Sequence, residues 1–234
     1  MQIGGLLPFT MIDFPGKLSA VVFTQGCPLR CPYCHNPELQ TPSVQTEIDW
    51  KGVLELLEKR KRLLDGVVFS GGEPLMQPDI EEAIRTVKQM GFSIGLHTSG
   101  AFLDKLEKVL PLVDWIGLDI KAPFNKYAKA SGTVETFEMG KKAEQALDMI
   151  LASGVSFEVR TTTDPRVLTK EDVLSLADVL SSKGVRRFVL QEYRPINKEG
   201  VPEPTYGEIT AFYTDKDFLK RLGNLFVGFD VRRA

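Results

Sequence analysis

All three cysteines of the chain lie in one short stretch, QGCPLRCPYCHNP, at residues 25–37. Cys27, Cys31 and Cys34 follow the spacing C-x3-C-x2-C, which lets three thiolates converge on one point from a compact loop. Thiolates are soft ligands that select zinc or iron–sulfur clusters. Three is an odd number for disulfides and falls short of the four ligands that most metal sites have. The stretch therefore predicts a metal centre that lacks one protein ligand.

Two metal centres are compatible with this loop. A zinc site would take His35 as its fourth ligand, but Cys34 and His35 are adjacent, whereas paired ligands of structural zinc sites usually stand further apart. His97 would have to come from a distant strand. A four-iron cluster on three thiolates would leave one iron open, as a catalytic zinc leaves one position for water or substrate. A buried cysteine loop without any metal is the third possibility.

Composition limits the class of protein around this centre. Of the 234 residues, 43% are hydrophobic and 26% are charged, and the formal net charge is −2. This balance lacks the clustered basic excess of nucleic-acid-binding proteins. The N-terminus lacks the features of a signal peptide, and no run approaches the roughly 20 apolar residues of a membrane span. We expect a cytoplasmic protein with reduced cysteines and with neither nucleic-acid nor membrane partners.

Short apolar segments rich in β-branched residues alternate with longer amphipathic ones. We predict strands at 18–24, 66–69, 92–96, 115–120, 155–161 and 187–191, and helices at 49–64, 78–90, 102–110, 137–153, 170–183 and 206–222. Six βα units in succession imply a parallel sheet with right-handed crossovers. No linker-like break interrupts them, so we expect one domain over residues 1–234, with a core at about 15–195 and a C-terminal helix and tail at 205–234.

Such a series could form a doubly wound sheet or a barrel. Unusual polar residues follow several different predicted strands. In barrel enzymes the catalytic residues likewise come from the carboxyl ends of many strands, which meet at one rim of the barrel. Doubly wound folds concentrate such residues at one switch point. The predicted fold class is therefore α/β, a partial, laterally open (β/α)6 TIM-like barrel of parallel strands.

A glycine-rich turn, Ser70-Gly71-Gly72-Glu73-Pro74, follows the second predicted strand. Gly71 and Gly72 allow a close backbone approach to a ligand because they lack Cβ, and Pro74 stiffens the turn. Taken alone, the segment also fits an ordinary Gly-Pro turn between a strand and a helix.

Together, the cysteine loop and the SGGEP turn resemble the motifs of the radical S-adenosylmethionine (radical SAM) superfamily. Tyr33, an aromatic residue before the last cysteine, belongs to the same pattern. The continuation Cys34-His35-Asn36-Pro37 is similar to that of the activating enzymes of glycyl-radical enzymes, such as those of anaerobic ribonucleoside-triphosphate reductase and of pyruvate formate-lyase. The resemblance covers roughly residues 15–195.

This resemblance implies the cofactors and the reaction. A 4Fe-4S cluster would be held by Cys27, Cys31 and Cys34, and its open iron would bind the amino nitrogen and a carboxylate oxygen of S-adenosyl-L-methionine. Reductive cleavage would give methionine and a 5′-deoxyadenosyl radical, which takes a hydrogen atom from the target. A low-potential electron donor such as flavodoxin or ferredoxin is also implied.

The resemblance assigns the cofactor contacts as well. Glu73, within the turn formed by Gly71, Gly72 and Pro74, would meet the methionine ammonium, and Tyr33 would lie near the adenine. Further contacts are expected near the ends of later strands, from His97, Thr98, Ser99, Lys121, Arg160 and Gln191.

Some of these assignments have alternatives. His97 stands where related activases carry an acidic residue, so it could contact the ligand or cap the strand end. Lys121, in the segment Asp119-Ile120-Lys121, could pair with the ligand carboxylate, as Arg160 could, or form part of a salt-bridged strand end with Asp119 as an internal partner. Related activases can carry a histidine shortly after the last predicted strand, and Arg194 occupies approximately that position in this sequence.

The expected function is the generation of a glycyl radical on a partner enzyme, with anaerobic ribonucleoside-triphosphate reductase as the expected partner. One alternative is an activase of pyruvate formate-lyase. Another is a radical SAM enzyme that acts on a small molecule, similar to the 7-carboxy-7-deazaguanine synthases. An electron carrier would have four thiolate ligands and no GGEP segment, while a zinc-stabilised binding module would contain zinc instead of iron.

Overall fold

The structure, a computed structural model, describes residues 1–42, 48–133, 138–193 and 206–233. The chain forms two compact units. Unit 1 contains Met1–Leu29, Asn36–Leu118 and Gln145–Phe157, and unit 2 contains Arg30–His35, Asp119–Glu144 and Glu158–Ala234. Cys27 therefore belongs to unit 1, while Cys31 and Cys34 belong to unit 2.

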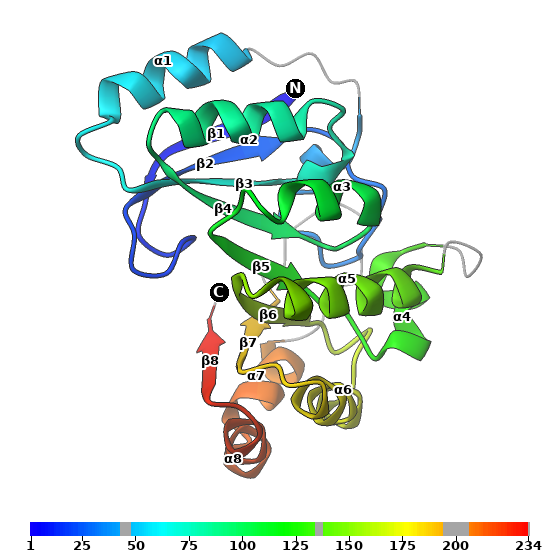
Figure 1. Ribbon diagram of the computed structural model, residues 1–234. Helices are drawn as coiled ribbons and strands as arrows, with labels where there is room; N and C mark the ends of the chain where they lie inside the picture. Colours follow the sequence, from blue (N-terminus) through cyan, green and yellow to red (C-terminus); the bar gives the residue numbers. More distant parts are fainter. Residues whose placement is uncertain (43–47, 134–137, 194–205, 234) are drawn as a thin grey trace. The chain divides into compact units, whose positions relative to one another are not determined.

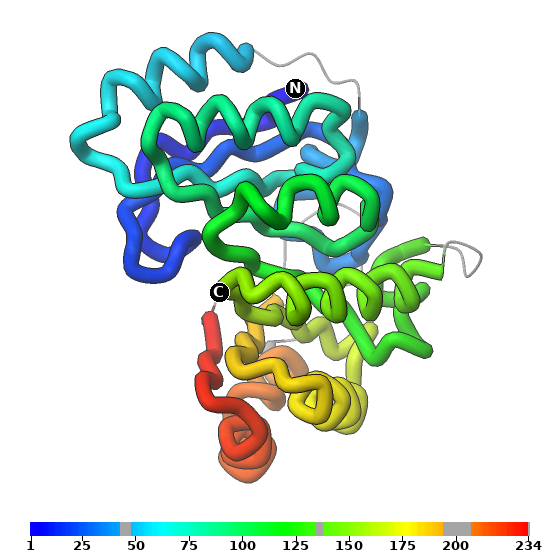
Figure 2. The backbone as a smooth tube through the Cα atoms, viewed as in Figure 1, coloured from blue at the N-terminus to red at the C-terminus, as the bar shows by residue number. Residues whose placement is uncertain are grey.

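Unit 1 is built on the first five strands, which lie side by side in chain order (Figures 1 and 2). They are β1 (Ile3–Thr10), β2 (Ser19–Thr24), β3 (Gly66–Gly71), β4 (Ser93–Thr98) and β5 (Trp115–Asp119). β1 pairs with β2 antiparallel, and the other neighbours pair parallel. Parallel pairing brings the carboxyl ends of β2, β3 and β4 to one edge, where the cysteine loop and the glycine-rich turn begin.

Helices connect these strands in unit 1. They are η1 (Pro37–Leu39), α1 (Trp50–Arg60), η2 (Pro74–Met76), α2 (Ile80–Gln89) and α3 (Leu103–Val109). α2 buries Ile80, Ala83, Ile84 and Val87, the apolar stripe of an amphipathic helix. Phe14, Val21, Val68 and Trp115 form a buried cluster, against which Phe23 packs. Trp115 is therefore a core residue.

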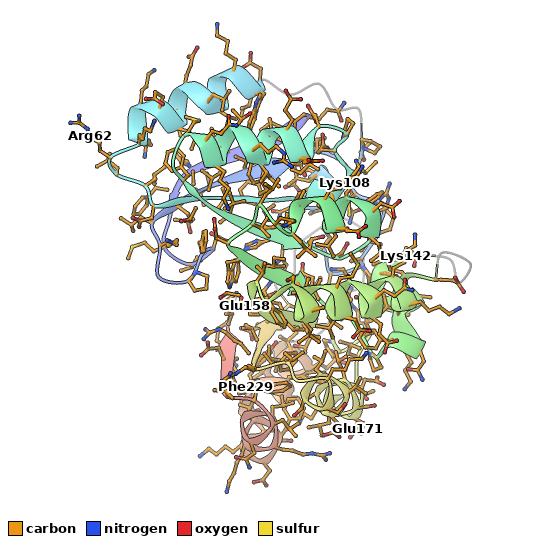
Figure 3. The ribbon with its side chains drawn as sticks, viewed as in Figure 1. Arg62, Lys108, Lys142, Glu158, Glu171 and Phe229 are labelled. Carbon is orange, nitrogen blue, oxygen red and sulfur yellow. The ribbon has the colours of Figure 1, made fainter. Side chains whose placement is uncertain are left out.

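Unit 2 is built on three parallel strands, β6 (Ser156–Thr163, whose first two residues belong to unit 1), β7 (Arg187–Glu192) and β8 (Gly228–Arg232). Its helices are η3 (Phe124–Lys126), α4 (Tyr127–Ser131), α6 (Lys170–Ser182), α7 (Tyr206–Thr214) and α8 (Lys216–Leu225), together with the start of α5 (Met139–Ser153). Glu158 of β6 is fully buried, and its carboxylate oxygens lie 3.2 Å from Arg187 and 2.7 Å from Arg232. Figure 3 labels Glu158 on β6 and Phe229 on β8.

The alternation of parallel strands and helices is as predicted, and the strands follow the order β1 to β8. Two predictions were wrong in detail. β1 and β8 add two strands to the six expected, and Gly4, Gly5 and Pro8 concealed β1 because these residues disfavour strands. The single helix expected at 206–222 is two helices, because the Asp215 side chain accepts a hydrogen bond from Phe218 N and starts α8.

Two sequence expectations fall on residues that the structure does not describe. They are the first residue of the helix expected at 137–153, and Arg194. Among the described residues, no helix combines the length and the apolar character needed to cross a bilayer.

Candidate active site

The glycine-rich turn of unit 1 packs on the backbone that leads into the first cysteine. Gly72 N donates to Thr24 O and Glu73 N donates to Gly26 O, both at 2.9 Å. A Cβ on Gly72 would lie 2.2 Å from Gly26 O, and one on Gly71, where φ is +116°, would lie 2.2 Å from Thr24 N. The two glycines therefore permit a close approach between two segments of the chain itself. Their expected approach to a ligand stays a prediction.

Further hydrogen bonds fix the start of the cysteine loop in unit 1. Cys27 N donates to Gln40 O at 3.1 Å. The Gln77 side chain donates to Gln25 O at 2.7 Å, and the Gln25 side chain donates to the carbonyls of Glu38 and Thr41. The backbone on both sides of Gly26 is thus anchored before the chain reaches Cys27.

Glu73 is a buried carboxylate with a full set of donors. It is 1% exposed. Its Oε1 accepts from Thr98 Oγ1 at 2.7 Å and from Leu75 N at 3.2 Å, and its Oε2 accepts from Ser99 N at 2.8 Å and from the Ser99 hydroxyl. Pro74 follows as the first residue of η2. The structure therefore brings together Glu73, Thr98 and Ser99, three residues singled out by the sequence, at adjacent strand ends.

The electrostatics of Glu73 are set by two opposing effects. Burial raises the pKa of this carboxyl above its ordinary value of 4.5, and the hydrogen bonds from Ser99, Thr98 and Leu75 lower it only partly. The folded state therefore binds the Glu73 proton more tightly than the unfolded chain does.

This raised pKa predicts a pH effect for Glu73→Gln. A group whose folded pKa is raised stabilises the fold most at low pH, and its contribution falls as the pH rises from about 4.5 towards the folded pKa. Because glutamine does not titrate, the unfolding free energy of the variant minus that of the wild type should increase with pH in this window. Urea unfolding at a series of pH values measures this difference. Glu82→Gln on the exposed side of α2 is the control, and a difference that is constant or falls with pH for Glu73→Gln would contradict the prediction.

His97 has protein partners on both ring nitrogens. Nδ1 lies 3.2 Å from Ser70 Oγ, and Nε2 lies 3.0 Å from Asp13 O. The ring also meets Trp115 edge-on, with centroids 5.6 Å apart. These contacts support the interpretation that His97 fixes the end of β4, and its contact with a ligand stays a prediction.

The middle of the cysteine loop belongs to unit 2. Cys34 N donates to Cys31 O at 3.1 Å, which closes a tight turn, and none of the three cysteines forms a disulfide. Tyr33 is 5% exposed, and its buried hydroxyl has no hydrogen-bond partner in the described part of the chain. A buried polar group without a partner costs about 1–3 kcal/mol. The Tyr33 hydroxyl therefore suits a polar group brought by a bound cofactor.

Charged residues meet at the end of β5 in unit 2. Arg160 Nε donates to Asp119 Oδ1 at 2.9 Å, and Lys121 Nζ lies 3.9 Å from Asp119 Oδ2. Burial alone would lower the pKa of Lys121, but the electrostatic interaction with Cys31 and Asp119 raises this pKa well above its ordinary value, so Lys121 stays a cation. The salt-bridged strand end is therefore present, and the pairing of Lys121 or Arg160 with a ligand carboxylate stays a prediction.

Gln191 is the penultimate residue of β7. Its backbone carbonyl accepts from Tyr213 Oη at 2.8 Å. The expected contact of its side chain with adenine stays a prediction, and Arg194 lies outside the described residues. Tyr213 was not singled out from the sequence, because nothing local marks it as a partner of β7.

The site residues expected from the sequence are divided between the two units. Unit 1 holds Cys27, Gly71, Gly72, Glu73, Pro74, His97, Thr98 and Ser99, and unit 2 holds Cys31, Tyr33, Cys34, Lys121, Arg160 and Gln191. Within the described part of either unit, no three His, Cys, Asp or Glu side chains are grouped as a metal-binding set.

Comparison with known proteins identifies the family. The model of the radical SAM superfamily matches residues 21–180. A protein of Methanocaldococcus jannaschii named as a glycyl-radical enzyme activating enzyme is 31% identical over 199 residues, which cover 82% of this chain and 80% of that protein. The pyruvate formate-lyase-activating enzyme of Clostridium pasteurianum is 30% identical, with 88% and 86% covered.

Solved structures share the fold at low sequence identity. A radical SAM methyltransferase from Sphaerobacter thermophilus has a TM-score of 0.71 at 16% identity, and the match covers 97% of this chain and 68% of that one. Streptococcus suis SuiB bound to S-adenosylmethionine has a TM-score of 0.66 at 14% identity, with 90% and 48% covered. The chain thus spans about half the length of SuiB.

These matches confirm the fold class, the partial barrel of parallel strands that radical SAM enzymes share. The chain belongs to the radical SAM superfamily and, within it, to the family of the glycyl-radical enzyme activating enzymes. It is accordingly an enzyme of this type, and the family implies a 4Fe-4S cluster and S-adenosylmethionine as cofactors. The three cysteines and the Tyr33 hydroxyl fit these groups.

Proposed function

We propose that this enzyme holds a 4Fe-4S cluster through Cys27, Cys31 and Cys34 and generates a glycyl radical on a partner enzyme. The observation that carries the proposal is the contact of Gly72 and Glu73 with Thr24 and Gly26, at the base of the cysteine loop. This contact brings together the cysteine loop and the SGGEP turn, the two sequence motifs that distinguish a radical SAM enzyme from a zinc-stabilised module or an electron carrier. The relatives named as activating enzymes support the choice within the superfamily.

The protein residues have binding and orienting roles in this proposal. When bound, the cluster and S-adenosylmethionine supply the electron and the 5′-deoxyadenosyl radical, and the protein supplies orientation and exclusion of water. The Glu73 carboxylate and the Thr98 and Ser99 hydroxyls would face the methionine ammonium. The cations of Lys121 and Arg160 would face its carboxylate.

The remaining contacts concern the nucleoside part of the cofactor. The Tyr33 hydroxyl, which is buried and has no described partner, would receive a polar group near the adenine. Gln191 at the end of β7 would contact the adenine itself. A low-potential donor such as flavodoxin or ferredoxin would deliver the electron.

The partner is proposed as a class, a glycyl-radical enzyme. Anaerobic ribonucleoside-triphosphate reductase is the candidate that the motif resemblance favours. Pyruvate formate-lyase is the second candidate, because relatives about 30% identical over most of this chain carry the name of its activating enzyme.

Electron paramagnetic resonance tests the proposal. The reconstituted enzyme is incubated anaerobically with reductant and S-adenosylmethionine, separately with each of the two candidate partners. A glycyl radical on one partner is the expected result. A matched partner whose radical-site glycine is replaced by alanine is the control and should show no signal. Deoxyadenosine formation without a radical on either partner would contradict the activase assignment and favour the 7-carboxy-7-deazaguanine synthase-like alternative, an enzyme that acts on a small molecule.

A further inference from the structure

The short helix α4 ends against the cysteine loop within unit 2. Arg30 N donates to Ser131 O at 2.8 Å, and Cys31 Sγ lies 3.9 Å from the same oxygen. Gly132 follows as the left-handed C-cap of α4, with φ +62° and its N–H bonded to Ala128 O. A single backbone carbonyl thus contacts both Cys31 and the residue before it.

Only glycine fits at position 132. A Cβ there would lie 2.0 Å from the carbonyl oxygen of Arg30 and 2.5 Å from its carbonyl carbon. Real Cβ atoms essentially never approach within 3.0 Å of another heavy atom, and backbone atoms cannot rotate away as a side chain can. Any side chain on residue 132 would therefore push the peptide between Arg30 and Cys31 away from Ser131.

The same helix is also tied to the end of β5. Tyr127 Oη accepts from Lys121 N at 3.0 Å and donates to Asp119 O at 3.3 Å. The fully buried Ser131 donates through Oγ to Tyr127 O at 2.9 Å. One series of hydrogen bonds therefore runs from the peptide before Cys31, through α4, to Lys121.

We propose that Ser131 and Gly132 form a seat for the cysteine loop, which positions the Cys31 thiolate for the cluster and holds it at a fixed place relative to Lys121. The inference rests on the proposed function, because the seat positions Cys31 as a ligand only if the protein holds the proposed cluster. Ser131 and Gly132 are positioning residues, because they act through Cys31. Replacing groups that orient a metal ligand typically lowers metal affinity about 10–100-fold.

Gly132→Ala and Gly154→Ala form a matched pair that tests the seat. Gly154 also follows a helix with a left-handed φ of +75°, but a Cβ there would meet nothing within 4 Å. Both variants carry the backbone strain of a side chain at positive φ, and only Gly132→Ala displaces the cysteine loop. Anaerobic titration of the apoprotein with iron and sulfide, followed by the signal of the reduced cluster, measures cluster affinity. We expect an affinity about 10-fold lower for Gly132→Ala and wild-type affinity for Gly154→Ala.

A second readout uses the apoprotein alone. Alkylation of Cys31 by iodoacetamide, followed by mass spectrometry relative to Cys34, reports how far the seat covers this thiol. We expect faster alkylation of Cys31 in Gly132→Ala and wild-type rates in Gly154→Ala. Wild-type cluster affinity together with wild-type alkylation in folded Gly132→Ala would overturn the inference.

Two further outcomes remain decisive. If circular dichroism shows that Gly132→Ala does not fold, Ser131→Ala is measured instead, since it removes the Oγ bonds to Tyr127 O, Ala128 O and Thr133 Oγ1 that hold the Ser131 carbonyl in place at the end of α4. Wild-type cluster affinity and Cys31 alkylation in Ser131→Ala would then overturn the seat. A wild-type protein that binds no iron would contradict the proposed function, whereas the alkylation rates would still show whether Ser131 and Gly132 hold the loop.

Discussion

Cys31→Ala is expected to abolish the formation of deoxyadenosine from S-adenosylmethionine while the protein stays folded. Replacing a residue that only supports a metal ligand typically lowers metal affinity or activity about 10–100-fold. Removing the ligand itself should therefore lower the rate of deoxyadenosine formation more than about 100-fold. The fold should tolerate the change, because Cys31 is only partly buried and forms no disulfide. Anaerobic reconstitution, iron and sulfide analysis and chromatography of the deoxyadenosine formed measure the effect.

His35→Ala is the matched control for this experiment. Residue 35 lies in the same loop and would be the fourth ligand of a zinc site. If the three thiolates hold a cluster, His35→Ala should retain its iron and most of its cleavage activity. Normal cluster content in Cys31→Ala, or loss of all metal in His35→Ala, would contradict the proposed ligation.

The second large effect is expected for Gly72→Ala, which should destabilise unit 1 and disturb the base of the cysteine loop. Its Cβ would lie 2.2 Å from Gly26 O and 2.7 Å from Leu39 O, so two backbone segments would have to separate. Overpacking a close contact typically costs about 1–3 kcal/mol, and rigid backbone atoms place this case at or above the upper end. Urea unfolding of the apoprotein measures the loss.

Gly5→Ala provides the comparison for Gly72→Ala in the same unit. A Cβ on Gly5 would meet its nearest neighbour, the Phe23 side chain, at 3.6 Å, an ordinary contact. Its unfolding free energy should change by less than about 1 kcal/mol, and a Gly→Ala change at such a site can even stabilise the protein. Equal stabilities for the two variants would show that the turn is not packed on the cysteine loop as the structure places it.

The family of this protein was predictable because its sequence signals are local. The spacing of the cysteines and the Gly71-Gly72-Glu73-Pro74 segment can be recognised without any knowledge of the fold. The parallel strands β2 to β5 were predictable for the same reason, since each contains a short apolar run. The parallel strand β8 (GFDVR) was missed because charged residues interrupt its apolar positions. β1 was missed because its pairing with β2 overrides the poor strand propensity of its glycines and of Pro8.

The roles that depend on tertiary contacts could not be predicted. Ser131 and Gly132 look like the end of a short helix, and their contact with Arg30 joins segments about 100 residues apart in the chain. The donors to Glu73 likewise come from the end of a neighbouring strand. The sequence singled out Thr98 and Ser99 as expected ligand contacts, but only the fold shows that both donate to Glu73.

The measurement that tests the central claim most directly is metal analysis combined with electron paramagnetic resonance of the reduced, reconstituted protein, before and after addition of S-adenosylmethionine. If the three thiolates leave one iron open, the protein should contain iron and sulfide in the ratio of a four-iron cluster, and its signal should change when the cofactor binds. A colourless protein that holds one zinc ion, or a cluster whose signal is unaffected by S-adenosylmethionine, would contradict the account.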